Sequence, residues 1–74
     1  MDNKKEVKKL TELDFPELKT DNPSPDQMYC RFYKETWTGW EVIKCSDDYS
    51  SEDDCRRAAA WAGANGYSWT GRSC

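Results

Sequence analysis

The chain has 74 residues, of which 36% are hydrophobic and 34% are charged, so it holds a single small domain. A core of this size is marginal without cross-links, a metal or a partner. The formal net charge is −3, and neither the part before Met28 nor the part after it is basic. This balance argues against nucleic-acid binding, because that affinity comes mostly from neutralised phosphates.

The first 27 residues differ in composition from the rest, since nine of the ten aromatic residues lie at or beyond Tyr29. Apolar residues near the middle of this part have a faint helical spacing, which Pro16 interrupts. Two prolines and polar turn formers then exclude regular structure. We therefore predict a disordered N-terminal segment over residues 1–27, ahead of a domain spanning residues 28–74.

An alternative interpretation makes this segment a leader peptide. Leu10, Leu13 and Leu18 would form a transient amphipathic stretch that an export or processing enzyme recognises, and residues 22–27 would be a flexible spacer near the cleavage site. The lysines at the start of the chain are not followed by the apolar run of a classical signal peptide, nor is a transmembrane segment visible.

Residues 29–45 have the pattern of a β-hairpin, with strand formers in both arms and Gly39 available for the positive φ that hairpin loops often need. A four-residue loop sets these pairs: Glu35 with Trp40, Lys34 with Glu41, Phe32 with Ile43 and Cys30 with Cys45. A two-residue turn at Thr38 and Gly39 would instead pair Phe32 with Cys45. We favour the first register because it gathers the apolar residues on one face.

Residues 50–62 are predicted to form the one convincing helix. Ser50 or Ser51 can cap it, and three acids in its first turn complement the helix dipole. The acids also form pairs four residues apart, Glu52 with Arg56 and Asp53 with Arg57. We interpret these charges as structural, because a calcium loop needs alternating ligands and a tight glycine turn.

The helix carries a stripe of small residues that lets it lie close to a sheet: Cys55, Ala58, Ala59 and Ala62. Trp61 is at the shoulder of this stripe and is expected to fold over the edge of the sheet. Gly66 is predicted to end the helix as a left-handed cap. The tail from Tyr67 to Cys74 must then fold back for its cysteine to reach a partner.

All four cysteines lie in the second part of the chain: Cys30, Cys45, Cys55 and Cys74. An even count in a short, aromatic-rich segment favours two disulfides and an oxidising destination, although three connectivities are open. Zinc is an alternative, but the gaps of 14, 9 and 18 residues do not match paired zinc ligands. Free or modified thiols are a third possibility. With no classical signal peptide, we expect secretion through a dedicated exporter.

Catalysis finds little support in the sequence. Histidine, the commonest general base, is absent, and no serine or threonine has a recognisable nucleophile setting. The glycines are too scattered for a phosphate loop. We predict that the chain is not an enzyme and needs no cofactor or metal. The aromatic residues exceed what so small a core can enclose, so we expect Trp37, Trp61 and Trp69 to contact a partner or a membrane.

The segment from Lys44 to Cys74 resembles the pediocin-like bacteriocins. In that family a cysteine precedes a short polar stretch that ends in an aspartate or asparagine and a tryptophan. Here Cys45-Ser46-Asp47-Asp48-Tyr49 keeps the aspartate, Asp48, and has an aromatic residue, Tyr49, in place of the tryptophan. A later cysteine, here Cys55, lies in an alanine-rich helix with a tryptophan, and a last cysteine closes the tail. Residues 58–62 and Cys74 look like these features.

The resemblance implies that Cys30 pairs with Cys45 within the sheet and that Cys55 pairs with Cys74 from helix to tail. The favoured hairpin register also brings Cys30 opposite Cys45. The chain differs from the family in its acidic helix start and in the wide spacing of its first two cysteines. The fold class we predict is α+β: a small disulfide-rich domain with a hairpin, one helix and a stapled C-terminal tail.

For function we predict an exported, ribosomally made, bacteriocin-like antimicrobial peptide precursor. It would act at a bacterial envelope or membrane receptor through Trp37, Trp61 and Trp69. The alternative is a small secreted binding or inhibitor module whose exposed aromatics meet a protein or a carbohydrate. The acidic charge favours this alternative, because anionic lipid attracts basic surfaces. The leader-like segment and the cysteine spacing favour the antimicrobial function.

Overall fold

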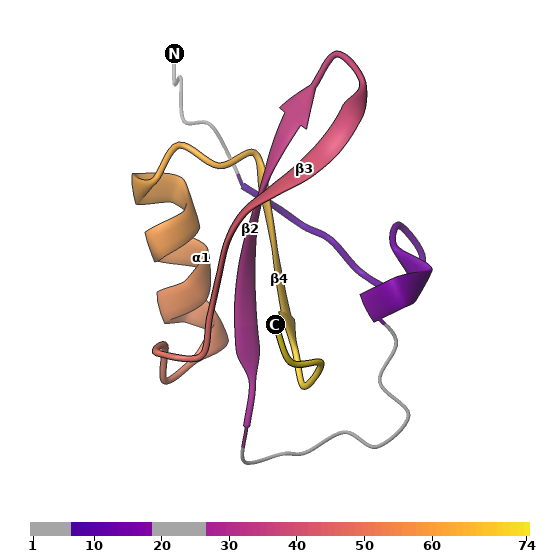
Figure 1. Cartoon of the computed structure of the whole chain (residues 1–74). Coiled ribbons are helices and arrows are strands. Elements are labelled where there is room, and N and C mark those ends of the chain that lie inside the picture. Colours follow the sequence, from indigo (N-terminus) through magenta and orange to yellow (C-terminus); the bar gives the residue numbers. More distant parts are fainter. Residues whose placement is uncertain (1–6, 19–26) are drawn as a thin grey trace.

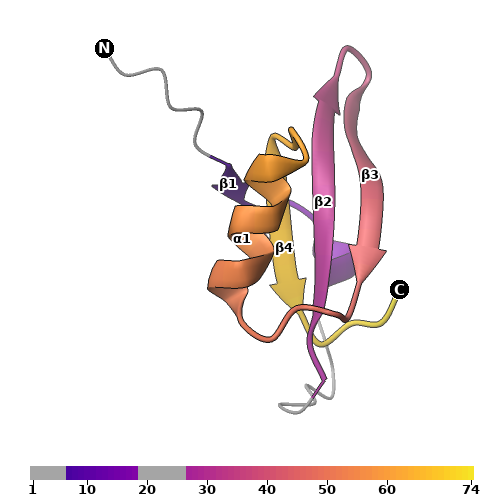
Figure 2. The same ribbon diagram turned by 90° about the vertical axis from the view of Figure 1, so that its left-hand side faces the viewer.

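The computed structural model describes residues 7–18 and 27–74, which form a four-stranded sheet with one α-helix on one face (Figure 1, Figure 2). The elements in chain order are β1 (Lys8–Lys9), the short 3-10 helix η1 (Pro16–Leu18), β2 (Tyr29–Thr36), β3 (Gly39–Ser46), α1 (Glu52–Trp61) and β4 (Gly66–Thr70). The strand order is β1-β4-β2-β3, with β1 parallel to β4 and the other neighbours antiparallel. The predicted α+β, disulfide-rich class is confirmed.

The outer half of the β2–β3 hairpin has the predicted register. Lys34 lies opposite Glu41, and Glu35 lies opposite Trp40. The pairing continues one step further than predicted, to Thr36 and Gly39, so the loop holds two residues and not four. Gly39 has a φ of +128°, a conformation that favours glycine.

The inner half of the hairpin is shifted by one residue, because β3 has an irregularity opposite the step from Phe32 to Tyr33. Cys30 therefore lies opposite Ser46, and the predicted pairing of Cys30 with Cys45 is wrong. Neighbouring residues of a strand point to opposite faces, so a shift of one residue exchanges the faces. Cys30 and Cys45 end on opposite sides of the sheet.

The tail that was predicted to fold back begins with a strand. Residues 66–70 form β4, which pairs with β2 along its whole length. Tyr67 lies opposite Phe32 and Trp69 lies opposite Cys30, so aromatic side chains alternate with small polar ones along β4. This alternation is the signal of a half-buried strand.

Helix α1 begins as predicted, with the Ser51 hydroxyl accepting a hydrogen bond from the Asp54 amide at 3.2 Å. The predicted cap at its other end is wrong. Gly63 takes the positive φ, +80°, directly after the Ala62 C-cap. Gly66 instead begins β4.

The core lies between α1 and the sheet. Its buried members are Cys30, Phe32, Cys55, Ala59, Ala64 and Tyr67. Two members of the predicted small-residue stripe, Cys55 and Ala59, are fully buried, whereas Ala62 is exposed. A small side chain at position 59 lets the helix backbone come close to the strands. No helix in the described ranges has the length and apolar character needed to cross a membrane.

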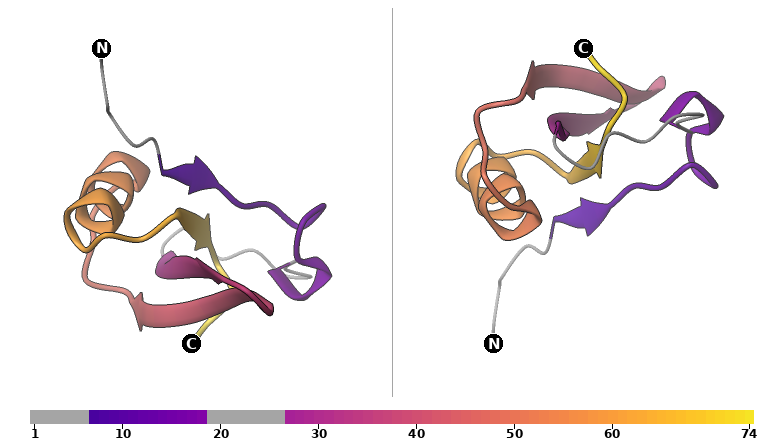
Figure 3. Two further views of the ribbon diagram at one scale, coloured as in Figure 1. Left: turned by 90° about the horizontal axis from the view of Figure 1, so that it is seen from above. Right: turned by 90° about the horizontal axis from the view of Figure 1, so that it is seen from below.

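The opposite face of the sheet is covered by residues 10–18, as Figure 3 shows. Leu10 and Leu18 are only 1% and 4% exposed, and the Phe15 ring stacks on Tyr33 with 5.1 Å between ring centroids. The prediction of a disordered segment is therefore wrong for residues 7–18, because three of its apolar residues have a sheet face to pack on. The rest of that prediction concerns residues 1–6 and 19–26, which lie outside the described residues.

Candidate functional site

Both disulfides differ from the pairing that the bacteriocin resemblance implies. Cys30 is bonded to Cys55, and Cys45 is bonded to Cys74. The face exchange in the hairpin explains the difference, because Cys30 points to the helix and Cys45 points away from it. The bonds use all four cysteines, so the zinc and free-thiol alternatives are wrong. Two disulfides point to an oxidising environment.

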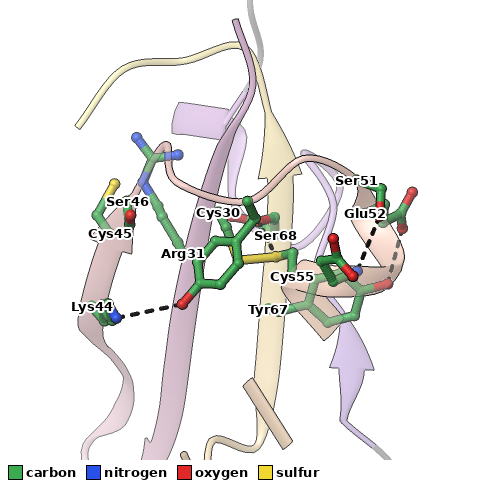
Figure 4. Close-up of a disulfide and its surroundings, with 12 residues drawn as sticks. Cys30, Arg31, Lys44, Cys45, Ser46, Ser51, Glu52, Cys55, Tyr67 and Ser68 are labelled. Atoms are coloured by element: carbon green, nitrogen blue, oxygen red, sulfur yellow. Dashed lines mark hydrogen bonds between the residues drawn. A yellow bond between two sulfur atoms is a disulfide. The ribbon is translucent and has the colours of Figure 1, made fainter. Parts of the chain in front are cut away.

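The two disulfides differ in accessibility. Cys30 and Cys55 are completely buried and join β2 to α1 inside the core (Figure 4). Cys45 is partly exposed, and Cys74 is exposed. The outer disulfide, Cys45–Cys74, is therefore accessible to solvent, whereas the inner disulfide, Cys30–Cys55, is not.

The chain end is also held by a buried arginine. The Arg31 guanidinium donates hydrogen bonds to the backbone oxygens of Arg72 and Ser73, at 3.1 Å and 2.7 Å, and to the Thr70 hydroxyl at 3.3 Å. Hydrogen bonding of this kind offsets the cost of burying a charge. The last residues are thus held to the sheet by the Cys45–Cys74 disulfide and by the hydrogen bonds of Arg31.

The three tryptophans predicted to contact a partner have two different environments. Trp37, in the hairpin loop, is 96% exposed, and Trp61, at the end of α1, is 93% exposed. The expectation that Trp61 folds over the sheet edge is wrong. Trp69 is partly buried against the core beside Cys30. The hairpin loop and the end of α1 both lie at one end of the molecule (Figure 1, Figure 2). We call residues 34–41 and 61–65 the tryptophan end.

Hydrogen bonds connect the two parts of the tryptophan end. Asn65 donates its backbone N–H to the Tyr33 oxygen at 2.8 Å, and its side-chain Oδ1 accepts from the Glu35 amide at 2.8 Å. The Lys34 ammonium donates to the Gly63 oxygen at 3.0 Å. The turn after α1 is therefore attached to β2 just before the hairpin loop. This attachment holds the end of α1 and the hairpin together at the level of the backbone.

The hydroxyls of the hairpin loop bond within the loop. Thr36 donates its hydroxyl to the Gly39 oxygen at 2.8 Å and accepts from the Thr38 amide at 3.2 Å. The two threonine hydroxyls are 3.1 Å apart. These bonds stiffen the loop that carries Trp37.

Acidic residues gather at the other end of the molecule, where β3 leads into α1. They are Asp47, Asp48, Glu52, Asp53 and Asp54. Of the two predicted ion pairs, that of Asp53 with Arg57 is confirmed at 3.0 Å. Arg56 also bonds to Asp53, and this hydrogen bond lowers the pKa of the Asp53 carboxyl. The predicted partner of Arg56, Glu52, bonds elsewhere.

Glu52 belongs to a cluster that sequence reasoning missed (Figure 4). The Tyr67 hydroxyl donates to Glu52 Oε2 at 2.9 Å, and the Lys9 ammonium lies 2.8 Å from the same oxygen. The bond to Lys9 lowers the pKa of Glu52. Burial, reinforced by Glu52, raises the pKa of Tyr67 to about 12. The phenol stays protonated at neutral pH and can donate its hydrogen bond. Through Glu52, this bond and the ion pair with Lys9 connect α1 to β4 and to β1.

Residues of the described ranges do not bring three His, Cys, Asp or Glu side chains together as a possible metal site. What the chain offers a partner is a pair of exposed rings on a cross-linked scaffold. Comparison of the chain with protein-family models, with curated proteins and with solved structures finds no match.

Proposed function

We propose that this protein is a small exported binding module that contacts its partner through the tryptophan end. The observation that carries the proposal is the exposure of Trp37 and Trp61, 96% and 93%, at one end of the molecule. Tryptophan is among the residues that most often carry binding energy in interfaces. Its exposure costs solubility, so two such rings at one end favour a contact surface.

The scaffold supports the same function. Binding costs less free energy when the contact residues are already in place, because less conformational freedom is lost. Here Asn65 and Lys34 attach the turn after α1 to β2, and the inner disulfide joins that helix to the same strand. Both rings are therefore presented by elements of one rigid unit.

The experiment compares Trp37→Ala and Trp61→Ala with Leu13→Ala. Leu13 is 92% exposed but lies on the segment that covers the other face of the sheet, so it controls for a general loss of exposed apolar surface. Binding is measured on intact bacterial cells, purified cell-wall polysaccharide and lipid vesicles. We expect both tryptophan variants to weaken binding and Leu13→Ala to leave it unchanged. Binding that survives both tryptophan changes contradicts the proposal.

Antimicrobial action at a bacterial envelope is the second candidate function. Tryptophan prefers the membrane–water interface, which favours this candidate. The observed disulfide pairing removes the support that the bacteriocin resemblance gave it. An export or processing enzyme acting on the N-terminal segment would be part of this function. The oxidised full chain should inhibit growth on a broad bacterial panel, with loss in the Trp37→Ala, Trp61→Ala double variant. No inhibition by the unaltered protein rules it out.

A further inference from the structure

We infer that Cys74 is a site of reversible modification by a low-molecular-weight thiol, and that Arg31 directs the thiol to this residue. The thiol exchanges with the outer disulfide and leaves Cys45 as the free thiolate. This inference goes beyond the proposed binding function and is independent of the tryptophan end. Three observations carry it: the unequal exposure of the two sulfurs, the charge beside them and the hydrogen bonds that hold residues 70–73.

The first observation concerns access to the outer disulfide. Cys74 is exposed, whereas Cys45 is partly covered within β3. A thiolate attacks a sulfur atom along the line of the S–S bond, so the rate of exchange depends on which sulfur it can reach. The inner disulfide is completely buried and is closed to this attack while the core is intact. A thiol in solution therefore reaches Cys74 first.

The second observation is a positive charge beside Cys45. Arg31 lies directly opposite Cys45 in the pairing of β2 with β3, and both side chains extend to the face of the sheet away from α1 (Figure 4). The β-carbons of residues paired in this way are about 4.5–5.5 Å apart. The guanidinium also donates to the backbone oxygen of Ser73, the residue next to Cys74, at 2.7 Å. It therefore lies beside the outer disulfide.

This positive charge has no anionic partner among the described residues. Arg31 is only 9% exposed, and the acceptors of its hydrogen bonds are one hydroxyl and two backbone oxygens, which are neutral. None of the ion pairs in the described ranges includes it. A buried charge is stabilised when an opposite charge forms next to it. A thiolate at Cys45 supplies that opposite charge.

Other charged residues near Cys45 have weaker effects on it. Asp47 and Arg72 are of opposite sign and both are exposed, so water and salt screen them. Lys44 extends to the other face of the sheet, where its ammonium lies over aromatic rings. The buried guanidinium of Arg31 therefore dominates the field at the Cys45 sulfur.

The exchange consequently has a preferred direction. The thiolate of the small molecule attacks the Cys74 sulfur and forms a new S–S bond there, and the electron pair of the broken bond passes to the Cys45 sulfur. Exchange is faster when the leaving sulfur is a more stable thiolate, and a nearby arginine stabilises a thiolate. One disulfide is replaced by one mixed disulfide, so the step needs no further oxidant or reductant.

The third observation accounts for the reversal of the modification. Arg31 holds the backbone oxygens of Arg72 and Ser73, so the chain before Cys74 stays close to β3 when the outer disulfide opens. The Cys45 thiolate then attacks the Cys74 sulfur of the mixed disulfide and expels the small thiol. Proximity of the two groups favours this intramolecular step. The disulfide re-forms once the external thiol is removed.

The test incubates the oxidised full chain with reduced glutathione and quenches the reaction at timed points with an alkylating reagent. Peptide mass analysis identifies the sulfur that carries glutathione and the sulfur that carries the alkyl group. We expect glutathione on Cys74 and the alkyl group on Cys45 in about tenfold excess over the reverse assignment, because access and leaving-group stability both favour it. Cys30 and Cys55 should stay unlabelled, which shows that the core is intact.

Three results of this experiment overturn the inference. They are glutathione mainly on Cys45, equal amounts on the two sulfurs, and no mixed disulfide while the inner disulfide is intact. Removal of the glutathione by desalting without alkylation should restore the outer disulfide. A mixed disulfide that persists after desalting overturns the claim of reversibility.

Arg31→Gln and Arg31→Lys test the role of the charge. In a Cys74→Ser background Cys45 is a free thiol, and its alkylation rate is followed over a pH series. We expect Arg31→Gln to move the rate profile by about one pH unit to the alkaline side, because a nearby opposite charge changes ionisation by at least this much. Arg31→Lys keeps the charge and should leave the profile near that of arginine.

A purely structural role of Arg31 would make the glutamine and lysine variants behave alike, and that result overturns the inference. Coincident profiles for all three proteins overturn it as well. Circular dichroism and an intact inner disulfide establish that each variant is folded. If a variant does not fold, the position of glutathione on the unaltered chain decides.

Discussion

Gly66 lies directly against Leu10. A β-carbon at position 66 would come within 3.0 Å of the Leu10 side chain and within 3.1 Å of the Lys8 backbone oxygen. The first residue of β4 thus has no side chain because β1 and the following residue occupy that space. The N-terminal segment therefore packs directly against the first residue of β4 at Leu10.

Gly66→Ala should therefore loosen the N-terminal segment. Overpacking of this kind typically costs about 1–3 kcal/mol, and we expect that loss in the free energy of unfolding by urea. A Leu10→Ala change in the same chain makes room for the new methyl group. The two effects should be less than additive. Full additivity would mean that the two residues do not interact.

Leu10→Ala and Leu18→Ala should each destabilise the protein by about 2–5 kcal/mol, the range for removing a buried leucine side chain. Leu13→Ala is the matched control, because Leu13 is exposed, and it should change stability by less than about 0.5 kcal/mol. Urea unfolding of the three variants measures this difference. Equal, small effects for all three would restore the prediction of an undocked N-terminal segment.

The outer disulfide should be reduced before the inner one. A thiol reagent reaches Cys45–Cys74 from solvent, whereas Cys30–Cys55 is buried and opens only when the core does. Timed alkylation in a mild dithiol, followed by peptide mass analysis, should find Cys45 and Cys74 labelled first. Labelling of all four cysteines at one rate would instead indicate that reduction requires global unfolding.

Tyr67 should make the protein sensitive to alkali. Its pKa is raised from 10.0 to about 12, so the folded state holds the phenol proton more tightly than the unfolded state. The stabilisation is complete below pH 10 and is lost as the pH rises toward 12. Urea unfolding at a series of alkaline pH values measures this loss.

Tyr67→Phe is the control for that series. It removes the titrating phenol and leaves every other ionisable side chain of the protein in place. The variant should be less stable at neutral pH, because Glu52 loses a hydrogen bond, but its stability should fall less steeply between pH 10 and 12. Parallel curves for the two proteins would show that Tyr67 does not carry the effect.

The sequence by itself determined the elements whose signals are local. Strand formers on both sides of a glycine-containing loop defined the hairpin. The outer pairs such as Lys34 with Glu41 followed from where that loop is centred, which is the same for the predicted four-residue loop and the observed two-residue loop. Ser51 and the acids after it defined the helix start. The exposure of Trp37 also followed locally, because the sequence placed this residue in the hairpin loop.

The tertiary structure decided everything that depends on which faces meet. One irregularity in β3 exchanged the faces of Cys30 and Cys45, and with them the disulfide pairing. Trp69 became a core residue because β4 pairs with β2. Residues 7–18 became ordered because the sheet has a second face to cover. Each of these outcomes depends on contacts between residues distant in the chain, and local sequence patterns carry no information about such contacts.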